Sequence, residues 1–311
     1  VVKAKFANLK LIAPTPQSKD DIHGLRKKIV RINGASENLK CRCITVSGND
    51  HLYMTDGYTI NHNTFQLLMG ALYDIDKSRF NAIIFRKEKD DLTNIIRDSQ
   101  ALYKGEGAYN RSKDDMTWYF NSGATLSLTY YAGAYKDFID RFQGRQYAYL
   151  GIDEITQIDY PKFKYLQSIN RNACGIKNRI IGTCNPDPTS WVRTFISWWI
   201  GDDGYPIPER DGKVRYVYMK GEDVNEAVWG DTREEVYEQC KDEIDGLWEH
   251  TWGNVNDVPA GYTPQRMFTK SVTFIRSELK YNKILVKSDP SYFANLAQQS
   301  EEQKARDLMG N

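Results

Sequence analysis

Residues 147–154, Tyr-Ala-Tyr-Leu-Gly-Ile-Asp-Glu, are the stretch that decides the fold. An apolar run of this length predicts a strand over 147–152 that is buried on both faces of a sheet. Ligands of open α/β sheets bind beyond the carboxyl ends of the strands, so Asp153 and Glu154 are candidate site residues. The alternative is an acidic pair that only caps the next helix.

The segments around this strand predict an alternation of strands and helices. Residues 65–73, 91–104 and 160–170 have the spacing of helices, whereas 80–85, 117–120, 124–131 and 179–183 have the composition of strands. This alternation indicates an α/β sheet with helices on both faces. Residues 201–242 are expected to be an insertion with a hairpin at 213–220 and no chemistry.

A second polar group follows the strand predicted at 179–183, which leads into Thr183-Cys184-Asn185-Pro186. In nucleotide hydrolysis Asp153 would hold Mg²⁺, usually through water, and Glu154 would orient and deprotonate the attacking water. Thr183 and Asn185 could then sense the γ-phosphate by hydrogen bonds. The alternative for this segment is a strand followed by an ordinary Asn-Pro turn.

Two arginines are candidates for contacts with phosphate. Arg86 ends the strand predicted at 80–85, and Arg141 precedes the Asp-Glu strand. Either could act as an arginine finger, within the same chain or from a neighbouring subunit. Surface salt bridges are the alternative for both.

Composition limits the classes of protein that fit. The 311 residues can form one large domain or two modest ones, and the net charge of +1 gives no overall attraction to nucleic acid. Five scattered cysteines indicate reduced thiols in a cytosol-like compartment, without a disulfide framework or a zinc site. No apolar run approaches the roughly 20 residues that span a bilayer, so no membrane association is expected.

His62-Asn63-Thr64 has residue types that suit cleavage of its own backbone. The Asn63 side-chain amide can attack its own carbonyl carbon and break the bond to Thr64, while His62 protonates the leaving amine. Thr64 can hold an acyl chain as an ester. Taken alone, such a tripeptide is far more often part of an ordinary polar turn.

The residues before this junction, LKCRCITVSGNDHLYMTDGYTINHN at 39–63, form short β-type runs separated by turns. They resemble the C-terminal end of an intein, a Hint-type splicing domain. The resemblance implies that His62 is the penultimate histidine, Asn63 the terminal asparagine and Thr64 the first residue after the intein. Cys43 is either a splicing nucleophile or a small buried strand residue.

The rest of the chain resembles the packaging ATPase domain of the large terminase subunit of tailed bacteriophages. The resemblance implies a P-loop NTPase sheet of the RecA-like (ASCE) type, with ATP and Mg²⁺ as cofactors. Its landmarks are FRK (85–87), WYFNSGA (118–124), DRFQG (140–144), the Asp-Glu strand, GTCNP (182–186), Trp191-Val192, Phe195, Trp198-Trp199, Phe274-Ile275, Asn282, DPSY (289–292) and LMGN (308–311).

The terminase resemblance also implies partners and a location. These are double-stranded DNA, a portal protein, a small terminase subunit and further copies of the chain in a ring. The motor would work in the host cytoplasm, docked transiently on the procapsid. A nuclease domain is expected beyond residue 311.

One family motif is missing from the sequence. The phosphate-binding signature GxxxxGK[ST] does not occur, and the single Gly-Lys pair, Gly212-Lys213, is followed by Val214. Thr64 fits the last position of the motif, where its hydroxyl would bind Mg²⁺. The sequence therefore predicts a leader at 1–24, an intein segment at 25–63 and an ATPase domain at 64–311. The P-loop and the rest of the intein are expected upstream, either in a separate fragment of a naturally split intein or in a part of the same protein that this sequence lacks.

Two other functions fit parts of the sequence. A freestanding autoprocessing protein of the hedgehog type would need neither Mg²⁺-dependent ATPase activity nor Glu154. A helicase-like ATPase would be followed by a second RecA-like core instead of a nuclease domain.

Overall fold

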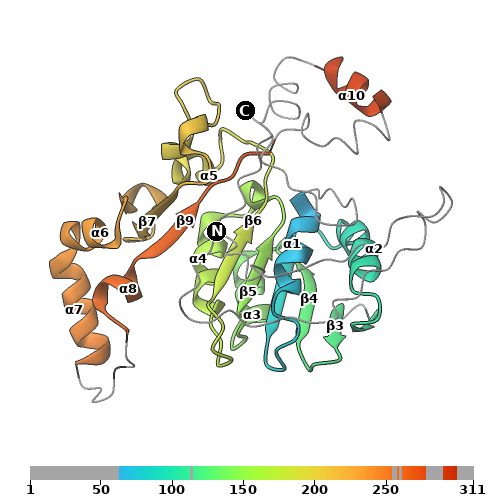
Figure 1. Ribbon diagram of the computed structural model, residues 1–311, viewed down its shortest axis with the longest axis horizontal. Coiled ribbons are helices and arrows are strands. Elements are labelled where there is room, and N and C mark those ends of the chain that lie inside the picture. Colours follow the sequence, from blue (N-terminus) through green and yellow to red (C-terminus); the bar gives the residue numbers. More distant parts are fainter. Residues whose placement is uncertain (1–62, 113–114, 254–257, 259–260, 278–289, 300–311) are drawn as a thin grey trace, which may run out of the picture.

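The computed structural model describes residues 63–112, 115–253, 258, 261–277 and 290–299 (Figure 1). The leader predicted at 1–24 lies outside these ranges, as does the predicted intein segment except Asn63. The expectations for His62 and Cys43 therefore remain predictions. No helix within the described ranges has the length and apolar character needed to cross a membrane.

The larger of the two described sheets is mixed and mostly parallel. Its strand order is β2-β3-β4-β1-β5-β6, and β4, β1, β5 and β6 run parallel to one another. The strands β2 and β3 add an antiparallel edge. The bounds are β1 Asn81–Arg86, β2 Gly107–Tyr109, β3 Thr117–Phe120, β4 Thr125–Tyr130, β5 Tyr149–Ile152 and β6 Arg179–Gly182.

Helices cover both faces of this sheet, as the sequence predicts. The side chains of β1 alternate between two cores: Ala82 and Ile84 pack on one face, and Ile83 and Phe85 on the other. The first face is covered by α1 (Asn63–Leu72) and α2 (Leu92–Leu102), the second by α3 (Tyr135–Phe142) and α4 (Tyr160–Ile169). The α/β fold class is thus confirmed.

Helix α1 is fastened to the sheet through its own backbone carbonyls. The buried hydroxyls of Tyr149 and Tyr103 donate hydrogen bonds to the carbonyl oxygens of Leu67, at 2.8 Å, and Leu68, at 2.6 Å. Arg179 donates to the Gly70 carbonyl at 2.7 Å. A Cβ atom at Gly70 would lie only 2.6 Å from the Tyr149 hydroxyl, so this close approach requires glycine.

The handedness of the crossover connections determines where in the sheet a strand directly before α1 would lie. From β4 through α3 to β5, and from β5 through α4 to β6, the chain moves towards the β6 edge along one face. A right-handed crossover whose helix lies on the opposite face must instead carry the chain towards the β2 edge. Because α1 lies on that opposite face and leads into β1, a parallel strand before it would have to lie beyond β6.

The second described sheet is antiparallel, with the order β8-β7-β9, and lies beside the first (Figure 1). It corrects the hairpin expected at 213–220, because these residues contain one strand whose partners are distant in the sequence. Local patterns cannot identify such partners. The remaining elements are β7 Val214–Tyr218, β8 Val228–Gly230, β9 Lys270–Thr273, α5 Trp191–Phe195, α6 Arg233–Gln239, α7 Lys241–Trp252, α8 Pro264–Phe268, α10 Pro290–Ala297, and the 3₁₀ turns η2 Ile155–Gln157, η3 Ser197–Trp199, η4 Pro208–Arg210 and η5 Val224–Glu226.

The buried hydroxyl of Tyr149 gives a prediction about alkaline stability. Burial raises the pKa of Tyr149 well above its usual value, although Arg179 offsets part of this effect. The folded chain therefore keeps this proton at pH values where the unfolded chain loses it, above about pH 10, and the free energy of unfolding falls as pH rises. Tyr149→Phe should make that fall shallower by about 1.4 kcal/mol per pH unit.

Urea unfolding at several pH values between neutral and strongly alkaline measures this slope. The control is Tyr262→Phe at an exposed position, where the hydroxyl is in water in both states. An alkaline slope for Tyr149→Phe equal to that of the unaltered chain would contradict the prediction.

Candidate functional site

The carboxyl ends of three neighbouring parallel strands bring Arg86, Asp153 and Thr183 together. Arg86 is the last residue of β1, Asp153 follows β5 and Thr183 follows β6. The chain leaves β1 towards β4 but leaves β5 towards β6, so the connections diverge between β1 and β5. A crevice at such a divergence is the usual ligand site of an open α/β sheet.

Asp153 is the centre of this group. The hydroxyl of Thr64, in the first turn of α1, donates to its Oδ2 at 2.8 Å, and the hydroxyl of Thr183 donates to its Oδ1 at 2.6 Å. The Arg86 Nε lies 3.2 Å from Oδ2. The aspartate is only 2% exposed, so these partners compensate for the loss of water around its charge.

Glu154 has an unusual backbone conformation. Its φ and ψ are both 55°, in the left-handed region that few residues other than glycine adopt. The Tyr131 hydroxyl donates to its backbone carbonyl at 3.2 Å. Its side chain lies 3.4 Å from Arg86 Nη2 and accepts a hydrogen bond from the Gln157 amide. It makes no capping hydrogen bond to η2, so the capping alternative does not apply to it.

Arg86 interacts with both carboxylates from a half-buried position. Its side chain is 17% exposed, and its Nη1 also donates to the Asp91 carbonyl at 3.4 Å. It is therefore part of an internal ion-pair network and not a surface salt bridge.

Arg141 is placed differently. It donates to the Ala132 carbonyl at 3.0 Å and packs over the Tyr130 ring at 4.4 Å. No contact between Arg141 and the carboxylates of Asp153 or Glu154 occurs among the described residues, and its finger role remains a prediction.

Asn185 is exposed, and the described contact is made by its backbone carbonyl, which accepts from Thr156 at 3.3 Å. Its role as a phosphate sensor remains a prediction. The neighbouring Cys184 is no nucleophile at neutral pH, because burial raises the pKa of its thiol to about 11.

Gly212-Lys213 lies in the second sheet's neighbourhood and does not form a phosphate loop. The Gly212 amide donates to Phe274, and the Lys213 carbonyl accepts from Trp199.

The oxygen ligands at this edge suit Mg²⁺. Hydroxyl and carboxylate oxygens are the donors that this ion prefers, and Thr64 and Asp153 present them side by side. No group of three or more His, Cys, Asp or Glu side chains among the described residues could hold a metal ion. Mg²⁺ here would thus take most of its ligands from water and phosphate, as it commonly does. The N-terminus of α1 adds a positive dipole that favours phosphate.

Comparison with known proteins places the chain in a family. Residues 63–311 match the family described as "Terminase large subunit, T4likevirus-type, N-terminal". The chain belongs to this family. No curated protein matches it.

A solved structure of the large terminase from a thermophilic bacteriophage (crystal form 2) is also similar. The identity is 16% and the TM-score 0.34, over 42% of this chain and 33% of that chain. The chain thus matches about a third of that terminase.

Two residues of the candidate site, Tyr131 and Gln157, were not predicted from the sequence. Tyr131 supports the Glu154 backbone, and burial, followed by the charges of Glu154 and Asp153, raises the pKa of its hydroxyl well above the usual value. It therefore stays protonated and can donate. Its position at the end of a predicted strand was the available signal. No signal in the sequence indicated Gln157, since its hydrogen bond to the Glu154 carboxylate depends on the backbone conformation of Glu154.

The ion pair of Arg86 gives a prediction about stability. Arg86→Met leaves the buried Asp153 carboxylate without a cation, so the free energy of unfolding should fall by about 3 kcal/mol. Asp153→Asn combined with Arg86→Met should recover part of this loss, because the double variant buries no unpaired charge. Urea unfolding at neutral pH measures both.

The matched control is Arg97→Met. Arg97 also pairs with an aspartate, Asp98, at 3.6 Å, but its side chain is 74% exposed, so its removal should cost less than about 1 kcal/mol. Equal losses for Arg86→Met and Arg97→Met would show that the internal pair contributes no more than an exposed one.

Proposed function

We propose that this chain supplies most of the Mg²⁺-dependent ATPase centre of a phage DNA-packaging motor. The observation that carries the proposal is the convergence of Thr64 and Thr183 on the buried Asp153, with Glu154 beside it. In this centre Thr64 and Asp153 would hold Mg²⁺ together with the ATP phosphates, and the ion would supply positive charge beside the transferred phosphoryl group. Thr183 keeps the Asp153 carboxylate in place.

Glu154 is the proposed general base, which orients the attacking water and accepts its proton. Its two carboxylate oxygens already have partners, Arg86 on one and Gln157 on the other. Each oxygen has a further lone pair, so a water can bind to the carboxylate beside these two partners. Thr183 and Asn185 are the candidates for sensing the γ-phosphate, and Arg141 is a candidate finger towards a neighbouring subunit.

The phosphate loop of this centre would come from an upstream fragment. The chain has no GxxxxGK[ST], whereas the N-terminus of α1, where such a loop would end, lies at Asp153. A strand directly before α1 would pair with β6, by the hand of the crossovers. In support, the residues of β6 are half-buried or exposed, whereas those of β5 are all buried.

The proposed intein ends at the Asn63–Thr64 bond. The support is the sequence His62-Asn63-Thr64 with the intein-like residues 39–63 before it. Thr64 serves both proteins: its hydroxyl accepts the upstream segment during splicing and binds Mg²⁺ afterwards. Residues 64–311 would then act as the ATPase domain, with 1–24 and 25–63 removed.

The proposed partners follow from the family. They are double-stranded DNA, the portal protein, the small terminase subunit and further copies of the chain in a ring, on a procapsid in the host cytoplasm. A nuclease domain would follow residue 311.

Glu154→Gln tests the ATPase in protein ligated to its upstream fragment. Loss of the base should slow ATP hydrolysis by about 10²- to 10⁴-fold, with little change in nucleotide binding. A coupled phosphate-release assay and binding of a fluorescent ATP analogue measure the two properties. The control is Glu222→Gln, an exposed glutamate paired with Lys164. Full activity in Glu154→Gln would remove Glu154 from catalysis.

Mixing the chain with an upstream fragment that carries the missing intein half tests splicing. Mass spectrometry should detect a ligated product that lacks residues 1–63, and Asn63→Ala should prevent its release because no side-chain amide can attack. A ligated product without any Mg²⁺-dependent ATPase activity would favour the hedgehog-type alternative. Absence of any product, unaffected by Asn63→Ala, would refute the intein.

A further inference from the structure

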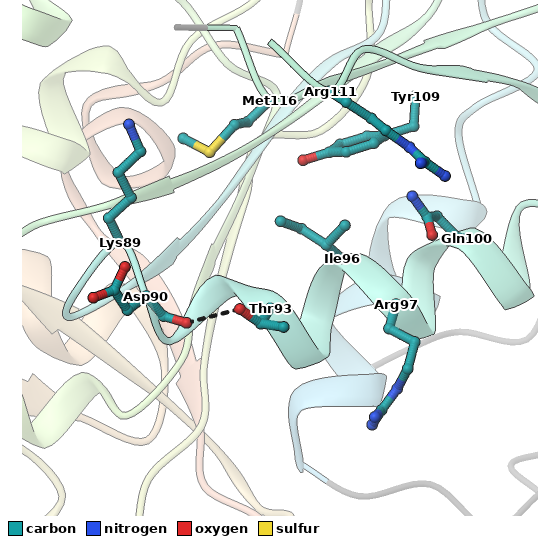
Figure 2. Close-up of a pocket in the computed structure, with 9 residues that line it drawn as sticks. All are labelled: Lys89, Asp90, Thr93, Ile96, Arg97, Gln100, Tyr109, Arg111 and Met116. Atoms are coloured by element: carbon teal, nitrogen blue, oxygen red, sulfur yellow. Dashed lines mark hydrogen bonds between the residues drawn. The ribbon is translucent and has the colours of Figure 1, made fainter. Parts of the chain in front are cut away.

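A groove separates α2 from the β2–β3 hairpin (Figure 2). Its volume is about 590 Å³. One end is formed by the loop between β1 and α2, and the other by the residues that follow β2. The lining residues are Lys89, Asp90, Thr93, Ile96, Arg97, Gln100, Tyr109, Arg111 and Met116.

The floor of the groove is mostly apolar and is packed against the core. Ile96, Tyr109 and Met116 form it, and Figure 2 shows the Tyr109 ring lying across the groove with its hydroxyl towards Met116. The ring packs against Trp118, a buried residue, at 5.6 Å between centroids. This floor therefore offers a rigid surface to the apolar side of a ligand.

The rim of the groove is cationic, in contrast to the chain as a whole. Three basic side chains line it against one acidic side chain, Asp90, whereas the chain has 42 basic and 41 acidic residues. Lys89 and Arg111 are exposed at opposite ends (Figure 2). Arg97 lies on the outer side of α2, where its contact with Asp98 is loose at 3.6 Å. Cations spaced along an open groove suit a ligand with repeated negative charges.

The groove also adjoins the proposed ATPase centre. The loop that carries Lys89 begins directly after Arg86, and the Arg86 guanidinium donates to the Asp91 carbonyl in that loop. A polymer in the groove would therefore pass beside the residues that hold Glu154.

We propose that this groove binds the sugar–phosphate backbone of DNA. Phosphates lie at Lys89 and Arg111, and deoxyribose lies against Tyr109 and Ile96. A polymer fits better than a free nucleotide because Lys89, Thr93 and Arg111 are exposed, whereas a small-molecule site buries about 70–90% of its ligand. The inference rests on the proposed function in assigning DNA as the partner.

The test is the salt dependence of binding of the full chain to a fluorescent DNA duplex, followed by anisotropy between about 50 and 200 mM salt. Lys89→Ala/Arg111→Ala removes two phosphate contacts, so the slope of log K against log salt should become shallower by roughly 1.8. The melting temperature should change little, because both side chains are exposed and contacts of exposed charges contribute little stability.

The matched control is Arg171→Ala/Lys177→Ala, which removes the same charge from exposed positions between α4 and β6. Its slope should equal that of the unaltered chain. The inference is overturned if both double variants change the slope equally, if the unaltered chain does not bind the duplex, or if ATP at the same phosphate concentration displaces the duplex completely. The last result would indicate a mononucleotide site.

The outcome is separable from that of the ATPase. An unchanged slope in Lys89→Ala/Arg111→Ala, together with ATP hydrolysis that depends on Glu154, would reject the groove and leave the motor. A shallower slope without any hydrolysis by the ligated protein would keep the groove as a DNA site and reject the ATPase.

Discussion

The buried carboxylate of Asp153 is the constraint on which the rest of this structure depends. A charge that is 2% exposed is costly unless donors replace its water, and here the donors come from α1, β1 and the end of β6. Each donor is useful only if its element is correctly placed. The position of α1 over the sheet, the register of β1 with β5 and the end of β6 are therefore all tied to one side chain.

The placement of α1 bears on how the proposed centre could be divided between two polypeptides. Its carbonyls are held by Tyr149, Tyr103 and Arg179, all of which belong to this chain. Within the described residues, the helix that would receive phosphate is thus held by side chains that lie after it in the sequence. A break just before Thr64 would then separate a loop and its strand from a preformed helix and sheet, and only the edge of β6 would remain to be paired. Pairing one strand with the edge of a formed sheet requires fewer new contacts than assembling a core from two pieces, since β6 already pairs with β5 on its other side.

The sequence was sufficient for the parts of the fold that depend on local patterns. The apolar runs predicted β1, β5 and β6, and the two polar ends placed Asp153 and Thr183 at one edge, because parallel strands share their carboxyl ends. It was insufficient where distant segments meet. The strand β7 pairs with β8 and β9, which no local turn indicates, and a hairpin was wrongly expected there. Likewise, a sequence pattern shows that Arg86 ends a strand. It does not show that the Arg86 guanidinium contacts the two carboxylates that follow β5, the neighbouring strand in the sheet.

Glu154 shows why a functional residue can oppose local preference. Its left-handed backbone costs of order 1 kcal/mol or more compared with an ordinary conformation, and glycine would remove that cost. The turn is needed because the Ile155 amide, directly after it, donates to the Thr183 carbonyl at 2.8 Å and ties the end of β5 to that of β6. Glycine would satisfy the turn but would leave Arg86 and Gln157 without the carboxylate they share. The strain is therefore compensated by Tyr131, which donates to the Glu154 carbonyl, and by the ion pair with Arg86. A residue held against its backbone preference by three partners from different elements is typical of a site where the side chain itself is required.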